Sequence, residues 1–101
     1  MSRCQEEKNL KNLTFESEIE SKLGHGIEDL GGVALKYEAG EGWPDRICVL
    51  PDGKILWVET KRPDGRVAVL QKWRHKFLRK LGHRVEVPKT KEEVERLIDS
   101  L

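Results

Sequence analysis

The chain has 101 residues, which suits one domain with a modest core, and its charged and hydrophobic residues each make up 37%, which excludes a disordered chain. No apolar run approaches the ~20 residues of a membrane span and no signal-peptide pattern opens the chain, so we expect a cytoplasmic protein. The two cysteines, Cys4 and Cys48, have no Cys or His partner at metal-ligand spacing, which excludes a typical zinc site. The net charge is +1, but the charged residues are unevenly distributed along the sequence.

The first half of the chain predicts an arm, a helix and three strands. Residues 1–12 are polar and lack a clear period, so we expect a flexible arm ahead of a single domain of residues 13–101. A helix should start near Thr14, which can cap it, and end at the Gly31–Gly32 pair. Its apolar stripe consists of Phe15, Ile19, Leu23, Ile27 and Leu30. Short strands are expected at 33–37, 45–50 and 54–61.

The second half predicts helix, strand and helix. A helix over 67–81 should pack through the apolar face formed by Leu70, Trp73, Phe77 and Leu81. Residues 83–87 alternate like a strand, and the T-x-x-E sequence from Thr90 to Glu93 is a capping box that opens a last helix. The order α-β-β-β-α-β-α indicates an α/β or α+β fold with a small mixed sheet flanked by helices.

The turn at Pro51–Asp52–Gly53 sets the register of the two strands around it. Proline suits the first corner of a type I turn, Asp the second, and Gly the left-handed position that forms a bulge. With three residues in the turn, Leu50 opposes Lys54 and Asp45 therefore opposes Glu59. A two-residue turn would shift the register by one and place the two acids on opposite faces.

Facing carboxylates in this register predict a metal site. Cross-strand partners have Cβ atoms ~4.5–5.5 Å apart, so one Mg²⁺ or Mn²⁺ ion could bridge Asp45 and Glu59. Lys61 points to the same side as Glu59 and could orient a metal-activated water or stabilise charge on a phosphate. The alternative is a surface Asp45 and an ordinary Glu59–Lys61 pair. Against that alternative stand the preceding Trp43–Pro44 and the basic helix downstream.

The charge is concentrated in one block of the sequence. Residues 60–84 hold nine Lys/Arg against one Asp/Glu, whereas residues 1–59 hold seven against twelve. A basic block beside an acidic site suits the binding of a polyanion, although a solvated helix surface would also give this pattern. Trp57 and Trp73 are expected in the core, and Trp43, on the loop before Asp45, either packs there or stacks on a base.

The ordered motifs Gly42–Trp43–Pro44–Asp45, Glu59–Thr60–Lys61 and Gln71 resemble the PD-(D/E)XK nuclease superfamily. More specifically, they resemble its virus-type replication-repair nuclease domain, VRR-NUC, in the stand-alone form found in phages and prophages. The resemblance extends from about residue 16 to 101 and includes the Gly31–Gly32 helix end and the return strand from Gly82. It implies a restriction-endonuclease-like core.

The resemblance also implies roles for individual residues. Asp45 and Glu59 would be metal ligands together with the backbone carbonyl of Thr60, and Lys61 would be the catalytic lysine. Gln71 would sit at the edge of the site, although it could instead be a simple helix cap. The first helix should supply a further acid, Glu16, with Glu20 in reserve. The residues expected to contact DNA are Arg62, Arg66, Lys72, Arg74, His75, Lys76 and Arg79.

The function implied is a Mg²⁺-dependent endonuclease of branched DNA, with Mn²⁺ as a substitute and no organic cofactor, acting in a bacterial or phage-infected cell. A stand-alone domain of this type resembles a homodimeric resolvase of four-way (Holliday) junctions, because a two-fold dimer places two active sites on a two-fold substrate. A flap or fork repair nuclease is an alternative. A non-catalytic DNA-binding module on the same fold is another, and it would require the loss of a metal ligand.

Overall fold

The computed structural model describes residues 16–61 and 65–101, so the expected N-terminal arm lies outside the described residues. The helices are α2 (Glu16–Asp29), α3 (Val69–Lys80) and α4 (Lys91–Asp99). The strands are β1 (Val33–Lys36), β2 (Arg46–Val49), β3 (Ile55–Val58) and β4 (Arg84–Glu86), with the one-turn 3-10 helix η1 (Pro51–Gly53) between β2 and β3. The order predicted from the sequence is confirmed, and the elements begin and end within a few residues of their expected bounds.

The four strands form one mixed sheet in the order β1-β2-β3-β4. The first two pairs are antiparallel and β3 pairs with β4 in parallel, which requires the crossover through α3. Arg46 pairs with Val58 and Val49 with Ile55, and the amide of Leu50 donates to the carbonyl of Lys54 over 2.8 Å. The predicted register between the two strands is therefore confirmed.

The turn itself differs from the expected type I geometry. Asp52 has φ +67° and Gly53 has φ +73°, so both residues are left-handed. A second corner with positive φ is not that of a type I turn, and Asp is one of the few residues besides Gly that tolerate it. The loop still contains three residues, which is why the register is unaffected.

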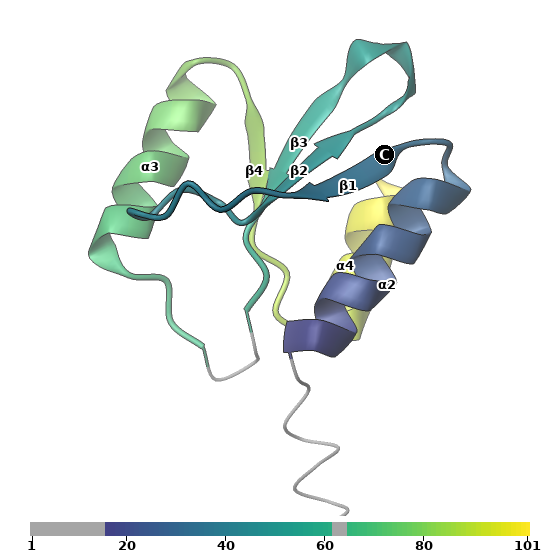
Figure 1. The fold of residues 1–101 in the computed structure, drawn as a ribbon, viewed down its shortest axis with the longest axis horizontal. Helices are drawn as coiled ribbons and strands as arrows, with labels where there is room; N and C mark the ends of the chain where they lie inside the picture. Colours follow the sequence, from purple (N-terminus) through teal and green to yellow (C-terminus); the bar gives the residue numbers. More distant parts are fainter. Residues whose placement is uncertain (1–15, 62–64) are drawn as a thin grey trace, which may run out of the picture.

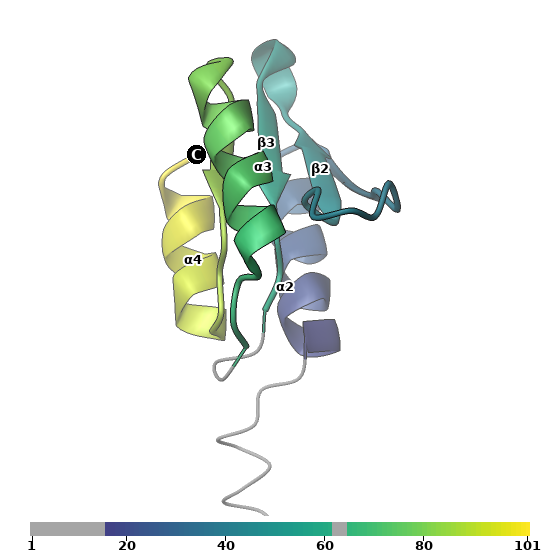
Figure 2. The same ribbon diagram turned by 90° about the vertical axis from the view of Figure 1, so that its left-hand side faces the viewer.

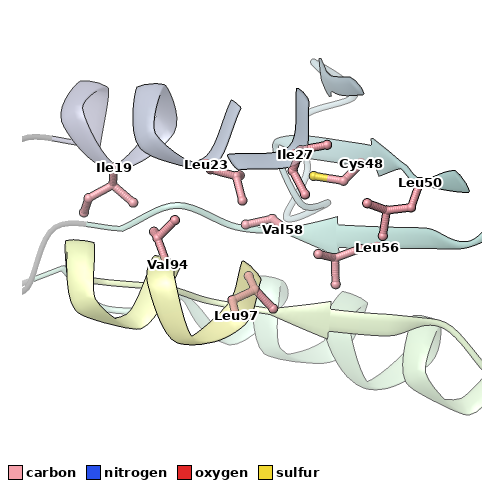
Figure 3. Close-up of a cluster of buried hydrophobic side chains, with 9 residues drawn as sticks. All are labelled: Ile19, Leu23, Ile27, Cys48, Leu50, Leu56, Val58, Val94 and Leu97. Carbon is pink, nitrogen blue, oxygen red and sulfur yellow. The ribbon is translucent and has the colours of Figure 1, made fainter. Parts of the chain in front are cut away.

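The core lies between α2, α4 and one face of the sheet (Figure 1). Ile19, Leu23 and Ile27 of α2 are fully buried as predicted, whereas Leu30, the last residue of the predicted stripe, is 41% exposed. Phe15 lies outside the described residues. They meet the core-facing side chains of β2 and β3 and the inward residues of α4, a cluster completed by Cys48, Leu50, Leu56, Val58, Val94 and Leu97 (Figure 3). The hydroxyl of Thr90 accepts from the amide of Glu93, so the predicted cap of α4 is present.

Helix α3 packs against β4 on the other face of the sheet. The prediction that Leu70, Trp73, Phe77 and Leu81 form its inward face is wrong, because these side chains are between 46% and 67% exposed. The buried residues of α3 are His75 and Leu78, and Gln71 lies one turn before His75. Trp73 is therefore not a core residue. None of the helices in the described ranges is long and apolar enough to cross a membrane.

Candidate active site

The Glu59–Thr60–Lys61 segment continues the path of β3 along β4. The amide of Glu59 donates to the carbonyl of Glu86 over 3.0 Å, and that of Lys61 donates to the carbonyl of Pro88 over 3.3 Å. These bonds hold the backbone in an extended form, so Glu59 and Lys61 point to the same side of the chain. Only 4% of Glu59 is exposed, which makes it an unusually buried carboxylate.

Asp45 lies against this segment from the neighbouring strand. Its Oδ1 accepts from the amide of Thr60 over 3.3 Å, and its Oδ2 lies 3.2 Å from the Thr60 hydroxyl. The same hydroxyl lies 3.1 Å from Oε1 of Glu20. A hydroxyl has one proton to donate, so Thr60 is shared between two carboxylates. The register predicted from the turn has thus brought Asp45 next to the Glu-x-Lys segment.

The loop before Asp45 is pinned to the start of α3 by Gly42. This glycine has φ +82°, and a Cβ there would lie 2.8 Å from Cγ of Leu70 and 3.1 Å from the amide nitrogen of Gln71. The neighbouring Trp43 ring packs edge-on against Phe77, with centroids 6.4 Å apart, and lies under the Arg74 guanidinium at 4.6 Å. Trp43 is therefore a packing residue that fixes the loop to the helix.

Gln71 combines the two roles that the sequence left open. Its Oε1 accepts from the amide of Ala68 over 2.8 Å and so caps the first turn of α3. Its Nε2 donates to Oε1 of Glu59 over 3.1 Å. The helix cap thus also holds the buried carboxylate, which fixes the rotation of α3 about its axis and turns Gln71 toward the sheet.

Two acidic residues near the start of α2, Glu16 and Glu20, lie at the same end of the sheet. Glu20 forms an ion pair with Arg46 over 2.8 Å and also meets Thr60, so its charge is already compensated. Glu16, one turn earlier, is close enough to act electrostatically on Glu59. Both candidate acids therefore lie near the Glu59–Thr60–Lys61 segment, and Glu16 is the one whose charge acts on Glu59.

Burial, as the largest cause, and the charges of Asp45 and Glu16 together raise the pKa of Glu59 from 4.5 to about 7, and Lys61 opposes this shift. Desolvated carboxylates that repel each other are stabilised by a cation. In the described part of the chain no three His, Cys, Asp or Glu side chains already converge on one point. The oxygen donors fit Mg²⁺, which keeps several waters and needs only one or two carboxylates.

His75 has a place that the sequence did not predict. It was expected to contact DNA, but it is only 3% exposed, so that prediction is wrong. Its Nε2 lies 3.7 Å from Oε1 of Glu59 and makes no hydrogen bond. Burial, Arg79 and Lys61 all lower the pKa of His75, which favours a neutral imidazole. The i, i+4 spacing from Gln71 was the available sequence signal for this position.

The remaining basic residues divide into exposed and engaged side chains. Arg66, Lys72 and Lys76 are exposed. Arg74 donates from Nε to the carbonyl of Glu41 over 3.1 Å, and Arg79 donates to the carbonyl of Val85 over 2.7 Å. Arg62 lies outside the described residues. Arg79 is also an exposed residue although it binds the backbone of β4, whereas Arg74 is half-buried.

Comparison with known proteins identifies the family. The chain is 39% identical over 77 residues to a protein named "Putative nuclease p44" of Acyrthosiphon pisum secondary endosymbiont phage 1, a match that covers 74% of this chain and 83% of that protein. A solved structure described as a VRR_NUC domain superposes with a TM-score of 0.75 at 32% identity, covering 83% of this chain and 94% of that one. The chain belongs to the VRR-NUC family of nuclease domains. No family model matches it.

This VRR-NUC domain has the α+β core expected of the PD-(D/E)XK superfamily, a small mixed sheet with helices on both faces. At one end of that sheet lie the residues singled out by the motif, Asp45, Glu59, Lys61 and Gln71, together with Glu16 and Glu20 from α2. Their catalytic and metal-binding roles, and that of the Thr60 carbonyl, stay predictions.

Proposed function

We propose that this VRR-NUC domain is a metal-dependent endonuclease that hydrolyses phosphodiester bonds of branched DNA, with a four-way junction as its substrate and a homodimer as its active form. One observation carries the catalytic part of the proposal. The buried carboxylate of Glu59 is fixed by Gln71, lies beside Asp45, and is followed by Lys61 on the same side of the chain.

This arrangement supports a hydrolytic metal site. Asp45, Glu59 and Glu16, with Glu20 in reserve, would hold Mg²⁺ or Mn²⁺ together with the backbone carbonyl of Thr60. A metal ion bound there supplies an activated water and neutralises charge on the phosphate. Gln71 keeps the Glu59 carboxylate in one orientation, and the ammonium of Lys61 can hold the attacking water or a phosphate oxygen as a point charge.

The basic residues beside the site support a polyanionic substrate. Lys72 and Lys76 are exposed on α3 and Arg66 is exposed just before it, so their charges can contact phosphates from the solvent side. Arg62 is included in the proposal on sequence grounds. Arg74 and Arg79 would act indirectly, by holding the 38–44 loop and β4 in place.

Cleavage of defined DNA substrates tests the proposal. Purified protein is incubated with Mg²⁺ or Mn²⁺ and labelled four-way junction, flap, fork and linear duplex, with Glu59→Gln and the exposed Glu92→Gln as matched variants. We expect paired, symmetric nicks in the junction with the wild type and Glu92→Gln, and none with Glu59→Gln. Lys61→Ala should lower the rate without abolishing metal binding.

The other outcomes correspond to the alternatives. Cleavage confined to flaps or forks would contradict a four-way junction as the substrate and favour a repair nuclease, and it would leave the assignment of the active site unchanged. DNA binding without cleavage of any substrate would contradict the enzyme proposal and favour a non-catalytic DNA-binding module. Full activity of Glu59→Gln or of Asp45→Asn would refute the assignment of these carboxylates.

A further inference from the structure

Arg46 is a charged side chain that lies mostly inside the protein. Only 12% of this side chain is exposed, and Arg46 directly follows Asp45 in the sequence. Side chains alternate along β2, so Arg46 points to the same face of the sheet as the fully buried Cys48, which is the face that α2 covers. A guanidinium is rarely buried without partners, so its contacts indicate what it does there.

The guanidinium of Arg46 binds one carboxylate and one backbone carbonyl. Its Nη2 lies 2.8 Å from Oε2 of Glu20, and its Nη1 donates to the main-chain carbonyl of Asp45 over 2.9 Å. The distance from Nη1 to Oδ2 of Asp45 is 3.9 Å, which is too long for a hydrogen bond. Arg46 therefore pairs with Glu20 and leaves the carboxylate of Asp45 to other partners.

Glu20 is held through both of its carboxylate oxygens. Oε2 binds Arg46, and Oε1 lies 3.1 Å from the hydroxyl of Thr60. The first turns of α2 lie beside the segment that leaves β3, which brings these side chains together (Figure 2). A metal ion that took Glu20 as a ligand would compete with one of these two contacts, and loss of the ion pair would leave Arg46 buried without its carboxylate. The contacts of Glu20 thus oppose its use as a metal ligand.

Thr60 connects this pair to the proposed metal site. It is 1% exposed, its amide donates to Oδ1 of Asp45 over 3.3 Å, and its hydroxyl lies 3.2 Å from Oδ2. Thr60 therefore contacts both oxygens of the Asp45 carboxylate, and its hydroxyl is the group that Asp45 and Glu20 share. The two neighbouring amides point to β4, so the amide and the carbonyl of Thr60 point to the opposite side, where Asp45 lies.

The charges around the site explain why Glu20 has a cation beside it. Asp45 and Glu16 already act on the buried carboxylate of Glu59 and raise its pKa. A further carboxylate without a partner would add to this repulsion, whereas Glu20 paired with Arg46 adds a hydrogen-bond acceptor and little net charge. The pair is thus suited to hold neighbouring groups in place rather than to attract a cation.

We propose that Glu20 and Arg46 are positioning residues of the metal site and that Glu20 is not a metal ligand. Arg46 holds Glu20, and Glu20 holds the hydroxyl of Thr60. Thr60 in turn orients the carboxylate of Asp45 and directs its own carbonyl to the same side. This role depends on the metal site in the proposed function, and it assigns the ligand from α2 to Glu16 alone.

The number of water molecules on a bound lanthanide ion tests whether Glu20 is a ligand. Tb³⁺ is a hard cation that binds oxygen ligands, and its luminescence lifetimes in H₂O and D₂O count the bound waters. Removal of a ligand adds a water to the ion, so we expect Glu16→Gln to gain a bound water. Glu20→Gln should keep the number found in the wild type, as should the control Glu92→Gln. A gain in Glu20→Gln, or an unchanged number in Glu16→Gln, would overturn the proposal.

The affinity for Mn²⁺, measured by isothermal titration calorimetry, tests the positioning role. Loss of a group that orients a metal ligand lowers metal affinity by roughly 10–100-fold, and we expect losses of this size in Glu20→Gln and in Arg46→Gln. If the pair acted only through charge, Arg46→Gln would remove a cation from beside the site and bind Mn²⁺ more tightly than the wild type. The double variant should bind no more weakly than either single variant, because the two residues act as a unit. Tighter binding by Arg46→Gln, or additive losses in the double variant, would overturn the proposal.

Conservative variants separate geometry from charge. Arg46→Lys keeps the positive charge but lacks the fork that reaches Glu20 and the Asp45 carbonyl together, so we expect it to bind Mn²⁺ more weakly than the wild type. Thr60→Ser keeps the hydroxyl that Thr60→Val lacks and should bind Mn²⁺ more tightly than Thr60→Val. Circular dichroism and thermal unfolding in a chelating buffer identify the folded variants, which are the ones compared. Wild-type affinity in both Arg46→Lys and Thr60→Val would overturn the proposal.

The positioning pair and the proposed nuclease can fail separately. A wild type that binds neither Tb³⁺ nor Mn²⁺ would overturn the metal site on which both depend. A wild type that binds metal and cleaves DNA, but uses Glu20 as a ligand, would overturn the positioning pair and retain the nuclease.

Discussion

The surroundings of Glu59 disfavour its ionised carboxylate unless a cation is bound beside it. It is almost fully buried, it accepts a hydrogen bond from Gln71, and Asp45 adds a second negative charge nearby. Burial first and Asp45 second raise its pKa to about 7. Ionised Glu59 therefore does not stabilise the metal-free protein, and its charge serves instead to bind a cation.

A consequence is that metal-free protein should lose stability as pH rises. Between pH 4.5 and 7 the folded protein holds a proton at Glu59 that the unfolded chain has released, so the free energy of unfolding falls across this window. We expect Glu59→Gln to flatten that part of the pH profile and to be more stable than the wild type above pH 7 by up to about 3 kcal/mol. Chemical denaturation in a chelating buffer measures this, with the exposed Glu92→Gln as control. Parallel pH profiles for wild type and Glu59→Gln would contradict it.

At the same scale, Gly42 is a position where no side chain fits. Gly42→Ala would meet both the positive φ and a Cβ within 3 Å of Leu70, so the loop that leads to Asp45 must shift. We expect a loss of stability of about 1–2 kcal/mol and a larger loss of cleavage, measured by thermal unfolding and by junction nicking. Gly40→Ala is the matched control, since Gly40 also has positive φ but has nothing near its Cβ position. Equal effects of the two variants would show that packing against α3 is irrelevant.

At the scale of the element, α3 has three sides with different partners. Gln71, His75 and Leu78 face the sheet and the site, and Lys72 and Lys76 face solvent. The third side is apolar and exposed, and consists of Leu70, Trp73, Phe77 and Leu81. A helix with two apolar sides is ambiguous in sequence, because hydrophobic periodicity alone does not say which side is packed within the chain. The hydrogen bond between Gln71 and Glu59 settles which side is inward.

Charge reversal on the basic flank of α3 should weaken DNA binding. The double variant Lys72→Glu, Lys76→Glu is expected to lower the affinity for junction DNA and to make its dependence on salt shallower, because fewer counterions are released on binding. Binding titrations at several salt concentrations measure both effects. Lys54→Glu, in the turn between β2 and β3, is the control and should bind like the wild type. An unchanged salt slope in the double variant would exclude this flank as the DNA contact.

At the scale of the whole molecule, one end of the sheet collects acids from distant parts of the chain. Glu16 and Glu20 come from α2, Asp45 directly precedes β2, and Glu59 directly follows β3. Bringing these negative charges together opposes folding, and any ion that binds the folded form alone stabilises it by mass action. The proposed metal site can therefore be tested without an activity assay.

Divalent cations should raise the unfolding temperature of this protein above pH 7. We expect Mg²⁺ and Mn²⁺ to stabilise the wild type by on the order of 2–3 kcal/mol at a hundredfold excess over the dissociation constant. The effect should be much smaller in Asp45→Asn and Glu59→Gln. Differential scanning fluorimetry with and without metal measures it, and Asp52→Asn, a turn acid far from the site, is the control. Equal stabilisation of all variants would place the metal elsewhere.

The sequence alone predicted the order of elements, because the caps and glycines that end helices and the alternation of the strands are local features. For the register around the turn it left two pairings: a three-residue turn places Asp45 opposite Glu59, and a two-residue turn does not. The structure has the three-residue pairing. The Asp45–Glu59–Lys61 motif was found before the fold, because its spacing along two adjacent strands fixes its spacing in space.

Only the tertiary structure decided which side of α3 is buried. The buried side with Gln71, His75 and Leu78 and the exposed side with Leu70, Trp73 and Phe77 have the same helical period. Which of them faces inward depends on a hydrogen bond from Gln71 to a residue twelve positions away. His75 became a buried neighbour of Glu59, and Trp73 became a surface residue, for that one reason. Contacts between distant segments fix the rotation of a helix, and a local pattern carries no information about them.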